Sequence, residues 1–334
     1  MPTNLPPGCY ADAAGNRRRL SGRPPDRLQE QLLTTGYTED TRPAIDTALV
    51  RRLVDSQFPQ WAGLPLTLVD PAGSDHVIHR LGDRLSVRLP RHAGAIGQAR
   101  KEYEWLPRLA PHLPLTVPVP VAVGEPGFGY PWRWAVARWI DGEVATAEAL
   151  GDSPAVAREL ARFLLALQRY EPEEPTALSA GGFPEDLVPG TLADRDEVTR
   201  AAIARVDGVF DGAAMTRLWD AALGAPAWDR PPVWIHGDFH TGNLLTRDGR
   251  LSAVIDFGGL AIGDPAGDLE IAYTLMTPAS RDVFRSALGS DDATWLRGRG
   301  WALTTGLTAY TAYADVDARI AEQTTRQINQ ALAG

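Results

Sequence analysis

The sequence contains one cysteine, Cys9, and one lysine, Lys101, among its 334 residues. A single cysteine excludes an internal disulfide framework and a zinc site built from several thiolates, so a reducing cytoplasm is the expected location. No apolar run approaches the roughly 20 residues that a membrane-spanning helix needs, and we expect no membrane partner. The N-terminal residues offer no secretory signal, because Pro6, Pro7 and Gly8 interrupt them.

An excess of positive charge is also missing. The net charge of −9 argues against general binding to nucleic acid, which needs a basic surface. Residues 42–140 carry twelve Arg or Lys against eight Asp or Glu, whereas residues 141–334 carry sixteen against twenty-nine. A mildly basic region suits an anionic nucleotide and a strongly acidic region suits a cationic partner, although acidic surfaces also keep proteins in solution.

The pattern along the chain predicts three regions. Residues 1–41 are rich in Pro, Gly, Arg and Thr without a sustained apolar period, which predicts a mobile extension. Residues 42–140 form the predicted first lobe, and residues 141–334 form a helical second lobe. A sheet-rich lobe before a helix-rich lobe predicts an α+β fold. The predicted strands lie at 66–70, 76–81, 84–89 and 132–140, and helical periods lie at 45–58, 97–109, 153–167, 197–224 and 294–332.

The densest group of polar residues lies in residues 233–269, VWIHGDFHTGNLLTRDGRLSAVIDFGGLAIGDPAGDL. Two short apolar segments each lead into a carboxylate, Asp238 in the first case and Asp256 in the second. Asn243 follows Asp238 by five residues. We expect the two apolar segments to pair as a hairpin-like unit that brings these three side chains to one rim.

These three residue types suit phosphoryl transfer, which depends on positioning and on charge stabilisation. An amide carbonyl and a carboxylate, from Asn243 and Asp256, are hard oxygen ligands of the kind that Mg²⁺ prefers. A nearby carboxylate such as Asp238 can orient an attacking hydroxyl and receive its proton. The pattern therefore predicts a magnesium-dependent kinase that uses a nucleoside triphosphate.

The order H-G-D-x-x-x-x-N, then I-D-F-G, then G-D-P-x-x-D-L resembles the aminoglycoside phosphotransferase family, small-molecule relatives of the protein kinases. The resemblance extends over most of residues 43–330 and implies a two-lobed, protein-kinase-like fold. It implies that Asp238 is the catalytic base and that Asn243 and Asp256 bind Mg²⁺. It also implies that Asp268 braces the catalytic loop and that His236 supports it.

The same resemblance implies how ATP or GTP is bound. Gly73 and Ser74 belong to the loop over the nucleotide, and Ala137 lies in the hinge whose backbone contacts the base. In that family the position of Arg88 usually carries a lysine that grips the α- and β-phosphates. Arginine can contact phosphate with two N–H groups, but its longer, planar fork makes the two residues non-equivalent. We expect Arg88 to pair with Glu102.

The acceptor is expected to be a small molecule with a hydroxyl group. Protein kinases carry an arginine between the His and the Asp of the catalytic loop, where it senses a phosphorylated activation loop, and this chain has Gly237 there. Only five residues separate Gly258 from Asp264, which leaves no room for a peptide-docking segment. An aminoglycoside-like amino sugar, a cationic acceptor, is one candidate. Another hydroxyl-bearing metabolite stays possible, because a fold alone does not fix the substrate.

Two other functions are compatible with parts of the pattern. One is a nucleotide-binding pseudokinase with a regulatory role, although Asp238, Asn243 and Asp256 are all intact. The other is a metallophosphoesterase, in which His236 and His240 would join the two aspartates as metal ligands. That class needs a G-N-H motif, and the chain has Gly-Asn-Leu at the corresponding place.

Overall fold

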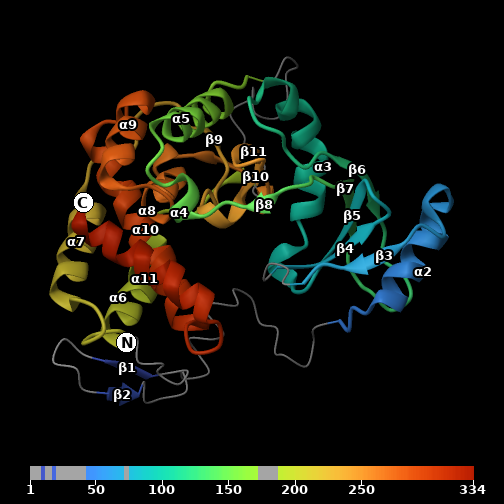
Figure 1. Cartoon of the computed structure of the whole chain (residues 1–334), viewed down its shortest axis with the longest axis horizontal. Coiled ribbons are helices and arrows are strands. Elements are labelled where there is room, and N and C mark those ends of the chain that lie inside the picture. Colours follow the sequence, from blue (N-terminus) through green and yellow to red (C-terminus); the bar gives the residue numbers. More distant parts are fainter. Residues whose placement is uncertain (1–8, 12–16, 20–42, 71–74, 172–186) are drawn as a thin grey trace.

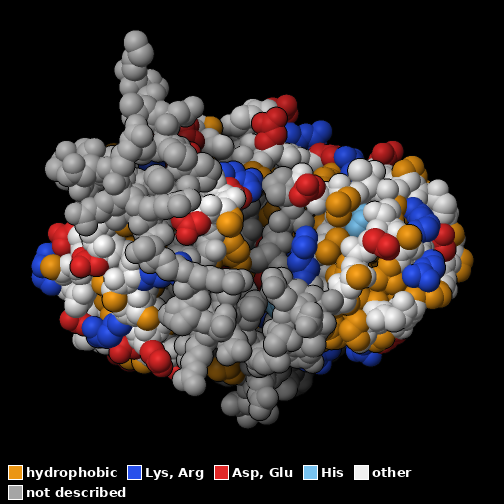
Figure 2. Space-filling view, turned by 90° about the horizontal axis from the view of Figure 1, so that it is seen from below, with side chains coloured by type: hydrophobic (Ala, Val, Ile, Leu, Met, Phe, Trp, Pro, Cys, Tyr) orange, Lys and Arg blue, Asp and Glu red, His pale blue; other side chains and the backbone are white. Residues whose placement is uncertain are grey.

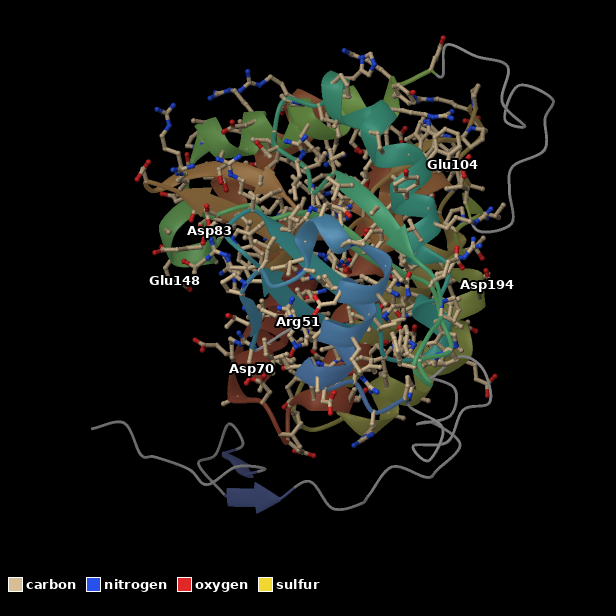
Figure 3. The ribbon with its side chains drawn as sticks, turned by 90° about the vertical axis from the view of Figure 1, so that its right-hand side faces the viewer. Arg51, Asp70, Asp83, Glu104, Glu148 and Asp194 are labelled. Atoms are coloured by element: carbon tan, nitrogen blue, oxygen red, sulfur yellow. The ribbon has the colours of Figure 1, made fainter. Side chains whose placement is uncertain are left out.

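The first lobe is a five-stranded antiparallel sheet with one long helix on each face. The computed structural model describes residues 9–11, 17–19, 43–70, 75–171 and 187–334. Strand order is β3-β4-β5-β7-β6. Helix α2 covers the outer face, and α3 lies between the sheet and the second lobe (Figures 1 and 3). The elements are α2 (Thr47–Gln57), β3 (Leu66–Leu68), β4 (His76–Leu81), β5 (Leu85–Pro90), α3 (Gln98–Leu109), β6 (Pro120–Gly124) and β7 (Trp134–Arg138).

Helix α2 begins directly after Asp46. The Asp46 carboxylate accepts a hydrogen bond from the backbone N–H of Leu49 at 2.7 Å, so Asp46 is the N-cap of this helix. The apolar stripe of α2 is buried against the sheet and forms a core with strand residues such as Val87 and Trp134. This core belongs to the first lobe alone, and its chief members are Leu49, Val50, Leu53, Val54, Leu81, Val87, Leu89, Trp134 and Val136.

The second lobe is mainly helical and has a larger core. Helix α5 begins after Ser153, whose hydroxyl accepts from the N–H of Val156, with Pro154 at the first position as expected. Trp105 and Leu106 of α3 belong to this larger core. The remaining helices are α4 (Ala147–Leu150), α5 (Pro154–Gln168), α6 (Asp196–Arg205), α7 (Gly212–Gly224), α8 (Ile271–Thr274), α9 (Pro278–Leu288), α10 (Asp292–Tyr313) and α11 (Ala318–Ala333).

The hairpin predicted between the two apolar segments before Asp238 and Asp256 is wrong. Strand β9 (Val233–Ile235) pairs with β12 (Ala261–Gly263), whereas β11 (Arg250–Val254) pairs with β10 (Leu244–Arg247). The reason is the Asp248-Gly249 turn, in which both residues have positive φ, 52° and 71°. Such a turn closes a tight hairpin between its own flanking strands, so β11 is already paired. Strand β8 (Glu143–Val144) completes this three-stranded sheet.

The α+β class and the order of a sheet-rich lobe before a helix-rich lobe are confirmed. The lobe boundary at residue 140 stays a prediction. Within the expected extension 1–41, β1 (Cys9–Ala11) pairs with β2 (Arg17–Arg19), and the other residues lie outside the described part. Among the described helices, none combines the length and the apolar character that a membrane crossing requires.

Candidate active site

The loop after β9 packs backbone against backbone on the turn after Asp256. Gly237 has a φ of +79°, and a Cβ atom added there would lie 2.0 Å from the carbonyl oxygen of Gly259. Real Cβ atoms do not approach so closely, and a positive φ also favours glycine. The structure therefore explains why glycine stands between His236 and Asp238: any side chain would separate the two loops.

Asp238 and Asn243 are joined directly. The Nδ2 group of Asn243 donates to the backbone oxygen of Asp238 at 2.9 Å and to its Oδ2 at 3.0 Å. Asn243 is the last residue of the short 3₁₀ turn Thr241–Asn243, and Asp238 precedes this turn. The side-chain amide nitrogen of Asn243 thus holds both the backbone and the carboxylate of Asp238.

His240 lies next to the same carboxylate, with its Nε2 3.7 Å from Oδ2 of Asp238. Burial lowers the pKa of His240, but Asp238 outweighs burial and raises this pKa to about 9. Burial raises the pKa of Asp238, yet His240 and Asn243 together hold it below its ordinary value. Although Asp238 is surrounded by protein groups, 52% of its side chain is exposed. Figure 2 shows that acidic and basic side chains are present on the surfaces of both lobes.

Asp256 completes the group from the neighbouring loop. Its backbone is left-handed, with φ 62° and ψ 72°, which L-residues other than Asn and Asp rarely adopt. The preceding residue, Ile255, donates its N–H to the backbone oxygen of Asn243 at 2.9 Å. The three predicted residues Asp238, Asn243 and Asp256 are thus brought together, through a pairing of strands different from the one expected.

Arg88 of β5 connects the first lobe to Asp256. Its Nη1 donates to both carboxylate oxygens of Glu102, at 3.0 and 2.8 Å, and its Nη2 donates to Oδ1 of Asp256 at 3.1 Å. The expected Arg88–Glu102 pair is therefore present. Burial acts to lower the pKa of Arg88, but Glu102 and Asp256 raise it above its ordinary value, so the guanidinium is charged.

His236 and Asp268 lie behind the loop and are fully buried. The Asp268 carboxylate accepts from the backbone N–H groups of His236 and Gly237, both at 2.8 Å. The His236 Nδ1 accepts from the N–H of Asp238, and its Nε2 lies 3.1 Å from the oxygen of Ile255. Burial lowers the pKa of His236 to about 4 and raises that of Asp268 to about 7. A neutral imidazole therefore lies between the two loops.

Three further residues, Gly73, Ser74 and Ala137, are predicted to contact the nucleotide. Gly73 and Ser74 lie outside the described residues. Ala137 lies inside β7 with 1% of its surface exposed, opposite Ser86 of β5. A contact between the backbone near Ala137 and a nucleotide base stays a prediction.

Glu270 is a charged neighbour that the sequence pattern did not single out. It is buried, it accepts from Nε2 of Gln327 at 3.0 Å, and burial raises its pKa to about 7. Its charge also acts on His240. The only available signal was its position two residues after Asp268, which by itself does not separate a core carboxylate from a site residue.

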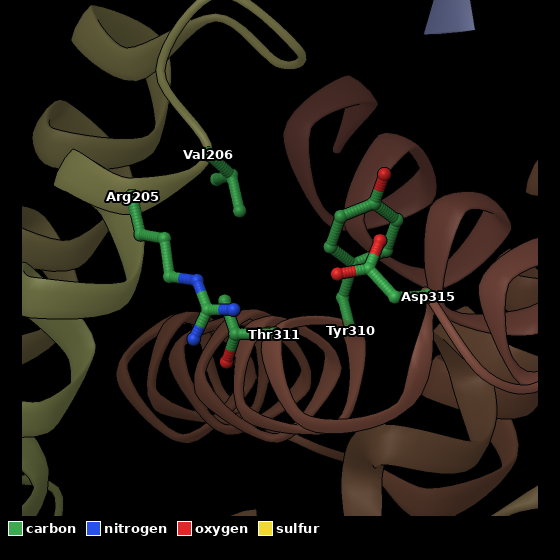
Figure 4. A pocket seen from close by; sticks show the side chains of 5 residues that line it. All are labelled: Arg205, Val206, Tyr310, Thr311 and Asp315. Atoms are coloured by element: carbon green, nitrogen blue, oxygen red, sulfur yellow. The ribbon is translucent and has the colours of Figure 1, made fainter. Parts of the chain in front are cut away.

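Tyr310 and Asp315 lie near the C-terminal end of α10 and just beyond it. They line a pocket between α6 and α10 together with Arg205, Val206 and Thr311 (Figure 4). Its volume of about 10 Å³ is close to the space for one water molecule. None of Asp238, Asn243 and Asp256 lines this pocket, so it is not the acceptor site.

The comparisons with known proteins agree with this geometry. The model of the phosphotransferase enzyme family matches residues 68–302, which include every predicted catalytic and metal-binding residue. The chain belongs to the phosphotransferase enzyme family. No curated protein matches this phosphotransferase in sequence.

Solved phosphotransferases share its fold. The GDP complex of wild-type aminoglycoside 2'-phosphotransferase-IIIa is 20% identical, with a TM-score of 0.65 over 86% of this chain and 99% of that one. Macrolide 2'-phosphotransferase MphH from Brachybacterium faecium is 24% identical, with a TM-score of 0.53 over 85% and 98%. A streptomycin–ATP ternary complex of APH(2")-IIa is 17% identical, with a TM-score of 0.53 over 86% and 97%. These likenesses establish the two-lobed, kinase-like fold.

Proposed function

We propose that this phosphotransferase moves the γ-phosphoryl group of ATP or GTP to a hydroxyl group of a small molecule. The observation that carries the proposal is the convergence of Asp238, Asn243 and Asp256 on two loops that are joined by hydrogen bonds. Solved structures of the same fold contain GDP or ATP, which supports a nucleotide donor of either kind.

The residues fit a magnesium ion. The Oδ1 of Asn243 accepts no hydrogen bond within the described part of the chain, and Oδ2 of Asp256 is likewise unengaged there. Both are hard oxygen donors on adjoining loops. When bound, Mg²⁺ would offset the negative charge of the transferring phosphoryl group. Asn243 and Asp256 would hold it.

Asp238 is assigned as the base. The acceptor oxygen attacks the γ-phosphorus, the bond to the β,γ-bridging oxygen breaks, the nucleoside diphosphate leaves, and the hydroxyl proton passes to the Asp238 carboxylate. Because its pKa lies below its ordinary value, this carboxylate is a weak base. Its main contribution is therefore to orient the hydroxyl and to take the proton late, which suits a loose transition state.

Further residues are assigned to support these three. Asp268 and His236 would fix the backbone of the loop that carries Asp238. Arg88, held by Glu102, would contact the phosphates. The loop with Gly73 and Ser74 would cover the nucleotide, and the backbone near Ala137 would contact its base.

The acceptor is proposed to be an amino sugar, a macrolide or another hydroxyl-bearing metabolite. Relatives of the same fold are aminoglycoside and macrolide phosphotransferases, and the acidic second lobe suits a cationic acceptor. Phosphorylation of an antibiotic inside the cytoplasm would make the enzyme a resistance factor.

Purified protein should be incubated with Mg²⁺, ATP or GTP and a panel of antibiotics and metabolites, with phosphate transfer read by mass. We expect one acceptor class to gain a phosphoryl group. Asp256→Ala should abolish Mg²⁺-dependent nucleotide binding. Nucleotide binding without any transfer, unchanged in Asp238→Ala, would instead indicate a pseudokinase.

A further inference from the structure

Arg88 already holds the carboxylate that the proposed function assigns to the metal. One end of its guanidinium is fixed on Glu102, which is 2% exposed, and the other end reaches Asp256, whose side chain is 37% exposed. Both of its terminal nitrogens, Nη1 and Nη2, are engaged in this way. With 9% of the Arg88 side chain exposed, a ligand gains its N–H groups chiefly by exchange with one of these partners.

We infer that Arg88 competes with the divalent metal for Asp256, so that the metal binds strongly only when a nucleotide phosphate draws the guanidinium away. The inference rests on the proposed function in one respect, the assignment of Asp256 as a metal ligand. A cation on Asp256 would repel the positive guanidinium bonded to the same carboxylate, and at short range this repulsion is weakly screened. Phosphate oxygens remove the conflict because they accept from the same N–H groups.

The contact with Asp256 is the one that gives way. Glu102 is buried, and removing the partner of a buried carboxylate leaves a charge without compensation, which is strongly unfavourable. Asp256 can be solvated, because more than a third of its side chain is open. The guanidinium therefore keeps Glu102 and exchanges Asp256 for phosphate.

Arginine makes this competition possible in the form seen here. Its two terminal nitrogens hold two different carboxylates simultaneously, with a planar fork between them. A lysine offers one nitrogen on a shorter side chain. Its hydrogen bond to either carboxylate is therefore weaker when the same nitrogen contacts both. Arg88 is thus a positioning residue that couples the binding of metal to the binding of nucleotide.

The test measures binding of Mn²⁺, by the spectroscopic signal of the free ion, with and without ADP. The double variant Arg88→Gln with Glu102→Gln removes the cation and its buried partner together, and Arg88→Lys keeps the charge with a shorter reach. Arg91→Gln is the matched control, because Arg91 lies on the segment after β5 and donates to the backbone oxygen of His76. Folding of each variant is checked by circular dichroism.

Without nucleotide, we expect the double variant to bind Mn²⁺ about tenfold more tightly than the wild type and Arg88→Lys about threefold more tightly. Arg91→Gln should match the wild type. ADP should tighten Mn²⁺ binding strongly in the wild type and little in the double variant. Equal Mn²⁺ affinity in the wild type and the double variant would overturn the inference, and Arg88→Lys decides the question if the double variant does not fold.

Asp256→Asn separates this inference from the proposed function. If it abolishes Mn²⁺ binding in the presence of ADP while the Arg88 variants behave like the wild type, the inference fails and the metal site stands. If Asp256→Asn retains that binding, the assignment of the metal ligand fails. Lack of phosphoryl transfer with the expected Mn²⁺ pattern would contradict only the proposed reaction.

Discussion

The two sides of the active site are held in different ways. On the side of the second lobe, Asp238 and Asn243 are fixed by backbone hydrogen bonds and by the close approach of Gly237 to Gly259. On the side that faces the first lobe, the carboxylate of Asp256, itself a residue of the second lobe, is held by the long charged side chain of Arg88. A site fixed through the backbone keeps its geometry during the reaction, whereas side-chain ion pairs can exchange partners. The difference suits chemistry on one side and ligand exchange on the other.

The largest effect should come from Asp238 itself. Asp238→Asn keeps the shape of the side chain but removes the proton acceptor and one charge, and we expect turnover to fall by roughly 10³-fold, within the range for general bases. Nucleotide affinity should change little. Steady-state kinetics and nucleotide titration check this. A loss of nucleotide affinity with unchanged turnover would contradict the assignment of Asp238 as the base and would indicate a role in nucleotide binding instead.

Gly237→Ala should damage the backbone-fixed side. The new Cβ would meet the Gly259 oxygen at 2.0 Å, so overpacking and a strained positive φ together should lower the free energy of unfolding by about 2–4 kcal/mol. Gly249→Ala is the matched control, because Gly249 also has positive φ, +71°, with open space around it. It should cost only about 1 kcal/mol. Thermal unfolding of both variants gives the comparison, and equal losses would contradict the close-contact argument.

Glu270→Gln should reveal the cost of a buried carboxylate whose pKa is raised by burial. Its folded pKa of about 7 exceeds the ordinary 4.5, so between these pH values the unfolded chain loses the proton first and stability falls as pH rises. The lowered pKa values of His76 and His236 act in the opposite direction. The difference between variant and wild type isolates Glu270, and it should favour the variant by about 1–3 kcal/mol more at pH 7.5 than at pH 4.5. Unfolding at several pH values measures it; a constant difference would mean that folding does not raise the pKa of Glu270.

The smallest effect is expected for an exposed ion pair. Glu125 and Arg133 lie 3.1 Å apart with 61% and 52% of their side chains exposed. Glu125→Gln should change the free energy of unfolding by less than about 0.5 kcal/mol, because solvent weakens such pairs. A denaturant titration checks this. A large fall in the free energy of unfolding would show that even exposed ion pairs stabilise this protein.

The sequence predicted the α+β class, most helices and the three converging residues, because their spacing along the chain is short. It did not predict the pairing of β9 with β12, although Asp248-Gly249 was a signal for the β10–β11 hairpin. The bridge from Arg88 to Asp256 joins residues 168 positions apart, and no local pattern encodes such a contact. The pair of Arg88 with Glu102 was predictable only from the family resemblance.

The replacement of lysine by arginine at position 88 changes which reagents can label the nucleotide site. Acylating nucleotide analogues tag kinases through a nucleophilic amine, but a guanidinium remains protonated and does not react with them. The chain's one lysine side chain, Lys101, is 8% exposed on α3. Amine-directed nucleotide probes would therefore meet no well-exposed lysine side chain in this protein.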